Sequence, residues 1–127
     1  MLLVKTKLGL SSISGIGLFA DEFIKKGTIV WEYTPLVDIL LSKEEIDRLP
    51  NNEQIHKYAY LDKKYGKYLL CGDDARFFNH SDKANCDDNY HDELDVTVAN
   101  RDIEIGEEIT CNYKSFYGNM EEHKEIL

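Results

Sequence analysis

One pattern occurs twice in this 127-residue chain and constrains its fold more than any other feature. Residues 20–30 have the spacing A-x-x-x-I-x-x-G-x-x-V, and residues 99–109 have A-x-x-x-I-x-x-G-x-x-I. Each copy is typical of a strand end, a charged bend, a turn at glycine and a new strand. Two copies are too few, and too far apart, for a solenoid. The repeat therefore predicts a compact fold built from two similar bent β units.

Periodicity and turn residues predict the remaining elements. Apolar and polar side chains alternate near the N-terminus, which is typical of a strand, and Ser42 and Glu45 have the S-x-x-E spacing of a helix capping box. Strands are expected over residues 2–8, 18–20, 28–33, 94–99 and 108–113, with a hairpin over residues 58–68. Short helices are expected over residues 42–49, 53–58 and 120–127. The sequence thus predicts a mainly β fold with short helices.

Composition limits what the chain can do. Hydrophobic residues make up 43% of it, as in ordinary globular domains, and no apolar run approaches the roughly 18 residues of a membrane span. We therefore expect a single domain without a membrane partner. The net charge of −9 argues against direct binding of nucleic acid, because that function needs a basic surface.

The cysteines favour a protein that works inside the cell. Cys71, Cys86 and Cys111 are odd in number and form no C-x-x-C pair, which argues against a disulfide framework. The first residues do not resemble a secretory signal. No metal site is expected, since His80, Cys86, His91 and Cys111 match no common zinc spacing.

Acidic residues are concentrated in one part of the chain. They are Asp73, Asp74, Asp82, Asp87, Asp88, Asp92, Glu93 and Asp95. One interpretation is a solvated loop face. The other is a surface that attracts a lysine- and arginine-rich peptide by long-range electrostatic steering. Both interpretations remain open from the sequence.

Three short segments carry the strongest functional signal. They are G-I-G-L-F-A at residues 15–20, R-F-F-N-H-S at residues 76–81 with Ala-Asn at 84–85, and G-E-E-I-T-C-N-Y at residues 106–113. In this order they resemble the glycine segment and the two signature motifs of SET-domain protein-lysine methyltransferases. The resemblance extends from about Val4 to Phe116 and so covers nearly the whole chain.

The resemblance implies a fold as well as a function. It implies one SET domain over residues 1–127, with a core over about residues 4–116 and a C-terminal segment over 117–127. The expected architecture is a β-clip-like folded ribbon of small sheets, with a C-terminal pseudoknot that brings the two signature motifs together. Cysteine clusters that flank the domain in many relatives are missing here, so the form expected is minimal and zinc-free.

The same resemblance implies the reaction. SET-domain enzymes transfer methyl groups from S-adenosylmethionine to a lysine amine, here expected on a histone-like or other lysine-rich protein. The amine must lose its proton, because a lysine pKa of about 10.4 keeps it charged in water, and an apolar channel favours that loss. Tyr113 ends the second motif and is the expected catalytic residue. Its hydroxyl would orient the reacting groups without bringing a full charge into the site.

Further site residues follow from the resemblance. The cofactor would be bound by Gly15, Ile16, Gly17, Leu18, Arg76, Asn79, His80 and Phe116. The glycines would let the backbone approach it, while Ile16 and Leu18 would cover it. The lysine substrate would be bound by Tyr58, Tyr60, Cys111 and Tyr117. Cys111 stands where many relatives have Tyr or Phe, so the number of methyl groups transferred stays open.

These residues also have structural interpretations. In these interpretations Tyr113 is a strand tyrosine and Asn79 forms a turn. His80 is then a core histidine, and Arg76 pairs with a neighbouring acid. Two other functions stay open: a catalytically silent SET-like module that binds a basic peptide or partner, and a β-clip domain of the antifreeze-like kind, which shares the pattern of residues 15–27. The sequence favours the methyltransferase because neither signature motif is broken. A homodimer would complete the substrate groove of so short a chain.

Overall fold

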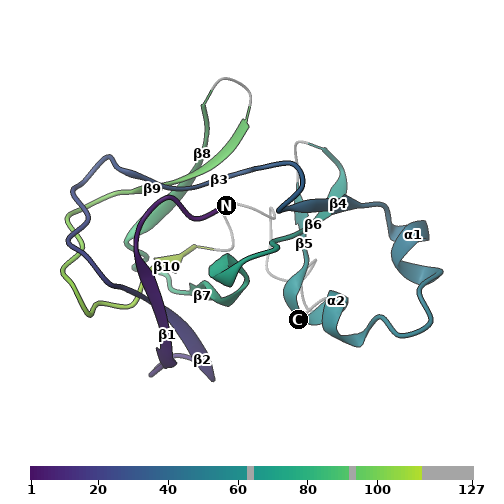
Figure 1. Cartoon of the computed structure of the whole chain (residues 1–127), viewed down its shortest axis with the longest axis horizontal. Coiled ribbons are helices and arrows are strands. Elements are labelled where there is room, and N and C mark those ends of the chain that lie inside the picture. Colours follow the sequence, from purple (N-terminus) through teal and green to yellow (C-terminus); the bar gives the residue numbers. More distant parts are fainter. Residues whose placement is uncertain (63–64, 92–93, 113–127) are drawn as a thin grey trace.

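The computed structural model describes residues 1–62, 65–91 and 94–112 of the chain. Over these residues the strands form sheets of two, five and three strands (Figure 1). The two-stranded sheet is a hairpin of β1 (Thr6–Leu10) and β2 (Ile16–Ala20). The five-stranded sheet has the order β3 (Ile29–Glu32), β9 (Leu94–Ala99), β8 (Cys86–His91), β10 (Thr110–Cys111) and β7 (Asn79–His80). The three-stranded sheet has the order β4 (Ile39–Leu41), β6 (Lys67–Leu70) and β5 (Tyr60–Asp62).

The helices are short, as predicted. They are α1 (Lys43–Asp47), α2 (Glu53–Tyr58) and the 3-10 helix η1 (Asp74–Phe77), and α1 and α2 lie beside the three-stranded sheet (Figure 1). The capping box is confirmed: Ser42 Oγ accepts from the Glu45 N–H at 3.1 Å, and Glu45 Oε1 accepts from the Ser42 N–H at 2.9 Å. No helix in the described part of the chain is long and apolar enough to cross a membrane. The helix predicted over residues 120–127 lies outside the described residues.

The two copies of the repeat pair with each other. Ile24 and Ile103 exchange backbone hydrogen bonds of 2.9 and 2.8 Å. The N–H groups of Gly27 and Gly106 each donate, at 2.8 Å, to the carbonyl of the alanine that begins the opposite copy. Both glycines have φ of 90°, a conformation that costs glycine little and other residues much more. The prediction of two similar bent β units is therefore confirmed.

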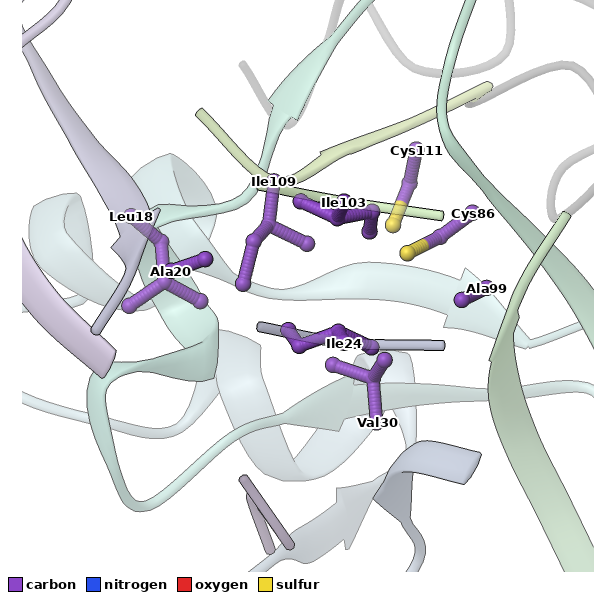
Figure 2. Close-up of a cluster of buried hydrophobic side chains, with 9 residues drawn as sticks. All are labelled: Leu18, Ala20, Ile24, Val30, Cys86, Ala99, Ile103, Ile109 and Cys111. Carbon is purple, nitrogen blue, oxygen red and sulfur yellow. The ribbon is translucent and has the colours of Figure 1, made fainter. Parts of the chain in front are cut away.

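The apolar positions of the repeat build the main hydrophobic core. All of them lie in one cluster, each at most 2% exposed (Figure 2). The cluster consists of Leu18, Ala20, Ile24, Val30, Cys86, Ala99, Ile103, Ile109 and Cys111. Burying a large aliphatic side chain contributes about 1.5–3 kcal/mol, so the repeated residues supply much of the stability that holds the sheets in place.

Strand β10 connects parts of the chain that are far apart in sequence. It lies between β8 and β7 and runs parallel to both, with Cys111 opposite Cys86 and Thr110 opposite Asn79. Parallel neighbours cannot be joined by a tight turn, so this arrangement needs the long excursion through β9 and the second copy of the repeat. Within the described residues the strand predicted over 108–113 is limited to Thr110–Cys111.

The acidic stretch is not a solvated loop face throughout, and that interpretation is corrected in part. Strand β8 runs through the stretch and pairs with β9 over six residues. Asp95 is only 3% exposed, and Asp73 caps η1 by accepting from the Ala75 N–H at 3.1 Å. Asp82 and Asp87 are exposed. Only some of the acidic residues are therefore available at the surface.

The first strand begins later than predicted. Strand β1 starts at Thr6, whereas Leu2 forms an isolated antiparallel bridge with Trp31 at the edge of β3. The Leu2 N–H also donates to Asp73 Oδ2 at 2.8 Å. The first residues thus extend the five-stranded sheet before the chain turns into the β1–β2 hairpin.

Candidate active site

A cleft of about 600 Å³ lies where three segments meet. It is lined by residues 13–16 of the turn between β1 and β2, residues 57–58 at the end of α2, and residues 76–80 from η1 and β7. The volume falls within the roughly 300–1,000 Å³ range of small-molecule sites. The predicted residues Gly15, Ile16, Tyr58, Arg76, Asn79 and His80 all line this cleft.

Aromatic and cationic side chains form one side of the cleft. The Tyr58 and Phe77 rings pack edge to face, with centroids 5.5 Å apart. The Arg76 guanidinium carbon lies 5.8 Å from the Tyr58 ring centroid, and Lys57 Nζ lies 5.4 Å from it. Such contacts contribute about 0.5–1 kcal/mol at exposed sites. Among the described residues no acid forms an ion pair with Arg76, and its guanidinium instead makes a cation–aromatic contact.

The two signature segments meet beside the cleft, which only the first of them lines. Asn79 and His80 of β7 lie opposite Thr110 and Cys111 of β10, and the Ser81 N–H donates to the Cys111 carbonyl at 3.1 Å. The juxtaposition that the resemblance implied is therefore present. Strand pairing thus places the two motifs side by side.

The polar side chains of the first segment have defined partners. Asn79 Nδ2 lies 2.9 Å from Glu108 Oε2, 3.1 Å from the Ser14 carbonyl and 3.3 Å from the Ile16 carbonyl. His80 Nε2 lies 3.1 Å from Asp82 Oδ1. The histidine side chain is thus directed to an exposed acid, and it is not the core histidine of the structural interpretation.

Asn85 is a residue whose role the sequence reasoning missed. It is 2% exposed and reaches the second motif, where its Nδ2 donates to the Glu108 carbonyl and its Oδ1 accepts from the Thr110 N–H, both at 2.9 Å. The Thr110 hydroxyl in turn accepts from the Asn85 N–H at 3.2 Å. The signal was available in the sequence, because Asn85 completes the Ala-Asn pair that follows the first motif.

Two residues of the glycine segment do not face the cleft. Leu18 is fully buried in the main core and does not line the cleft, so the structure gives its side chain a packing role. Gly17 lies under the Glu108 carboxylate, and a Cβ built there would be 2.5 Å from Glu108 Oε2. Gly15 does line the cleft, with φ of 47°.

The predicted substrate residues are dispersed. Tyr58 lines the cleft, whereas Tyr60 packs against the second buried cluster, of Trp31, Leu69, Cys71 and Ala75. Cys111 is fully buried and turns its sulfur toward Cys86 (Figure 2), so the described residues give it a core position and no contact with the cleft. Tyr113, Phe116 and Tyr117 lie outside the described residues.

The buried thiols are chemically quiet. Burial, with a smaller contribution from Asp87, raises the pKa of Cys86 to about 12, and burial raises the pKa of Cys111 well above its usual range. Thiols that stay protonated are poor nucleophiles. Among the described residues, no group of three or more His, Cys, Asp and Glu side chains is placed to hold a metal ion.

Comparison with known proteins identifies the family. The SET domain model matches residues 15–114, and the chain therefore belongs to the SET-domain family. It is 29% identical to histone-lysine N-methyltransferase 2D of Homo sapiens and of Mus musculus, over 92% of its own length. It spans only 2% of the length of these curated relatives.

Solved structures share the fold. A Plasmodium falciparum protein is 24% identical, with a TM-score of 0.67 over 93% of this chain and 100% of that one, which shows the common fold. A chain of the Chaetomium thermophilum Polycomb Repressive Complex 2 is 28% identical, with a TM-score of 0.69 over 94% of this chain and 16% of that one. That structure is described as autoinhibited and bound to S-adenosylmethionine.

Proposed function

We propose that this chain transfers methyl groups from S-adenosylmethionine to a lysine side-chain amine of a basic protein. The observation that carries the proposal is the pairing of β7 with β10, because it places the second signature motif directly beside the first, whose residues line the cleft. Homology to histone-lysine methyltransferases supports a methyltransferase in general. The relatives are far longer than this chain, so activity of the chain by itself is part of the proposal.

The residues of the cleft fit the cofactor chemically. S-adenosylmethionine has an aromatic base, a cationic sulfonium and an amino-acid end, and when bound it supplies an activated methyl group. For the aromatic base the cleft offers the rings of Tyr58 and Phe77. For the amino-acid end it offers the amide of Asn79 and the positive charge of Arg76. Gly15 has no side chain to obstruct the wall. The proposal assigns cofactor binding to Gly15, Ile16, Arg76, Asn79 and His80, with Phe116 added by the family resemblance.

The chain's own residues would perform the remaining chemistry. Tyr113 would present its hydroxyl to the lysine nitrogen and orient the amine for in-line attack, because a neutral phenol polarises without adding charge. Apolar walls would favour the neutral amine by desolvation. Orientation of two reacting groups can account for on the order of 7–11 kcal/mol of the barrier. No covalent intermediate with the protein is needed.

A lysine-rich protein suits the surface near the first motif. Asp82 and Asp87 are exposed there, close in sequence to the cleft residue His80. Acidic groups beside a site raise the association rate of a basic partner and make that rate dependent on salt. We therefore propose a histone-like or other lysine-rich substrate. The three unpaired cysteines support an intracellular setting.

The decisive experiment is calorimetric titration of the folded protein with S-adenosylmethionine, followed by labelled methyl transfer to lysine-rich proteins. We expect micromolar binding and incorporation of label at lysine. A folded protein that binds no cofactor would refute the proposal and favour a silent module that binds basic peptides. Size-exclusion chromatography with light scattering in the same buffers would show whether the active species is a homodimer.

A further inference from the structure

We propose that Glu108 is a positioning residue that orients the Asn79 amide and anchors the turn forming one wall of the cleft. This inference deepens the proposed function and rests on it, since the cleft is taken as the cofactor site. Glu108 lies in the second motif, immediately before the buried end of the repeat. Its side chain contacts Asn79, which lines the cleft, and Ser11, which begins the turn whose residues 13–16 line it.

The Glu108 carboxylate accepts hydrogen bonds from both segments. Ser11 Oγ lies 2.7 Å from Oε1 and 3.0 Å from Oε2, and Asn79 Nδ2 lies 2.9 Å from Oε2. An ionised carboxylate can only accept. Ser11 must therefore use its single hydroxyl proton on Glu108, and the nitrogen end of the Asn79 amide must face the carboxylate.

These contacts determine which way the Asn79 amide faces. The Ser14 and Ile16 carbonyls, at 3.1 and 3.3 Å, lie near the same nitrogen as Glu108. Reversing the amide would bring its oxygen against three acceptors, which is unfavourable. The amide oxygen is consequently held away from them, and no described residue donates a hydrogen bond to it. That oxygen is then presented to an N–H donor of a ligand in the cleft.

Ser11 connects Glu108 to the turn that forms this wall of the cleft. Its hydroxyl oxygen accepts from the Ile13 N–H at 2.9 Å and from the Ser14 N–H at 3.3 Å. Its own N–H donates to the Gly15 carbonyl at 2.9 Å. Residues 13–16 line the cleft, so the turn that forms this wall is closed on Ser11, and Ser11 is held by Glu108.

Gly17 leaves open the space that the Glu108 carboxylate occupies. A Cβ at Gly17 would lie 2.5 Å from Glu108 Oε2, 2.8 Å from Glu108 Cδ and 3.0 Å from Ser11 Cβ. Distances below about 3 Å are not tolerated by real side chains, so any larger residue would displace the carboxylate. The second glycine of the G-x-G segment thus makes room for Glu108.

The test compares Glu108→Ala with Glu107→Ala by calorimetric titration with S-adenosylmethionine and by thermal unfolding. Glu107 is a matched control, because its carboxylate accepts from the Glu104 N–H at 3.1 Å and does not line the cleft. We expect Glu108→Ala to raise the Kd about tenfold or more relative to Glu107→Ala, at a similar Tm. Glu108→Gln keeps one accepting oxygen and should have an intermediate Kd. It also serves as the test variant if Glu108→Ala does not fold.

Hydrogen exchange of the backbone amides tests the anchoring separately. Loss of Glu108 should speed exchange at Ile13 and Ser14, and Ser11→Ala combined with Glu108→Ala should weaken binding less than the sum of the single changes. Equal Kd values for the Glu107 and Glu108 variants would overturn the positioning role. If the unmodified chain binds no S-adenosylmethionine, the proposed function fails. In that case hydrogen exchange in Glu108→Gln still tests the anchoring. Unchanged exchange at Ile13 and Ser14 would overturn the anchoring role as well, and faster exchange there would support it.

Discussion

Asn85→Ala should destabilise the fold strongly, because this side chain fastens the second motif to the first. The Asn85 carboxamide donates to the Glu108 carbonyl and accepts from the Thr110 N–H, both at 2.9 Å, in a position that is 2% exposed. Truncation would leave the buried Thr110 N–H and the half-buried Glu108 carbonyl without this partner. A buried orphaned group costs about 1–3 kcal/mol and an ordinary hydrogen bond about 0.5–1.5 kcal/mol, so the expected loss is about 1.5–4.5 kcal/mol.

Asn100→Ala is the matched control for this change. Asn100 also makes two side-chain hydrogen bonds, to the Ala84 carbonyl at 2.9 Å and to Asp87 Oδ1 at 3.0 Å. Its environment is half-buried and Asp87 is exposed, so water can replace the lost partner. We expect its cost to stay near the roughly 0.5–1.5 kcal/mol of an ordinary hydrogen bond.

Urea denaturation at low temperature measures both variants, since domains of this size have about 5–15 kcal/mol of stability to lose. Binding of S-adenosylmethionine by the folded fraction of Asn85→Ala should also weaken, because Thr110, which pairs with the cleft residue Asn79, would lose one of its supports. If the two asparagine variants lost the same free energy of unfolding, within about 0.5 kcal/mol, the fastening role of Asn85 would be refuted.

Further changes probe the reaction, the substrate and the core. Tyr113→Phe should lower turnover about 100-fold or more while leaving the calorimetric Kd for S-adenosylmethionine within a few-fold, and unchanged turnover would exclude Tyr113 as the orienting group. Replacing Asp87, Asp88 and Asp92 by Asn should slow capture of a basic peptide in stopped-flow mixing and flatten its salt dependence; no change would leave these acids as a solvated face. Because burial raises the pKa of Cys86 to about 12, against about 8.5 in an unfolded chain, the free energy of unfolding should be unaffected by this thiol below about pH 8.5. It should then fall as pH rises toward 12, and Cys86→Ala should make that fall shallower in urea titrations.

Local patterns predicted the parts of the fold that local physics determines. The capping box at Ser42 and the glycine turns of the repeat need only neighbouring residues, and both were predicted correctly. Strand β8 was missed because its sequence, C-D-D-N-Y-H, is poor in the β-branched residues that favour strands. It becomes a strand because β9, L-D-V-T-V-A, supplies a strongly strand-forming partner along its whole length.

The candidate site could be predicted only as a set of motifs. Asn79 and His80 were expected near the second motif, but that expectation came from family resemblance, since two-residue parallel strands leave no periodic signal in the sequence. The contact between Ser11 and Glu108 joins residues 97 positions apart, and no spacing rule reaches that far. Leu18 was assigned to the cofactor site from the family resemblance. Its place in the core could not be predicted, because that depends on which face of β2 packs against the repeat.

The repeat does more than fill the core, because it also brings the glycine segment to the second motif. Its second copy ends at Ile109, whose N–H donates to the Leu18 carbonyl at 2.8 Å, and the Ala20 N–H donates to the Glu107 carbonyl at 2.9 Å. The strand that begins the first copy therefore lies against the strand that ends the second, and Phe19 forms a bridge with Glu108. This pairing puts the Glu108 carboxylate over Gly17, within reach of the cleft. A fold made from two bent β units thus determines which residues meet at the site, because Glu108 of the second copy contacts the cleft residue Asn79.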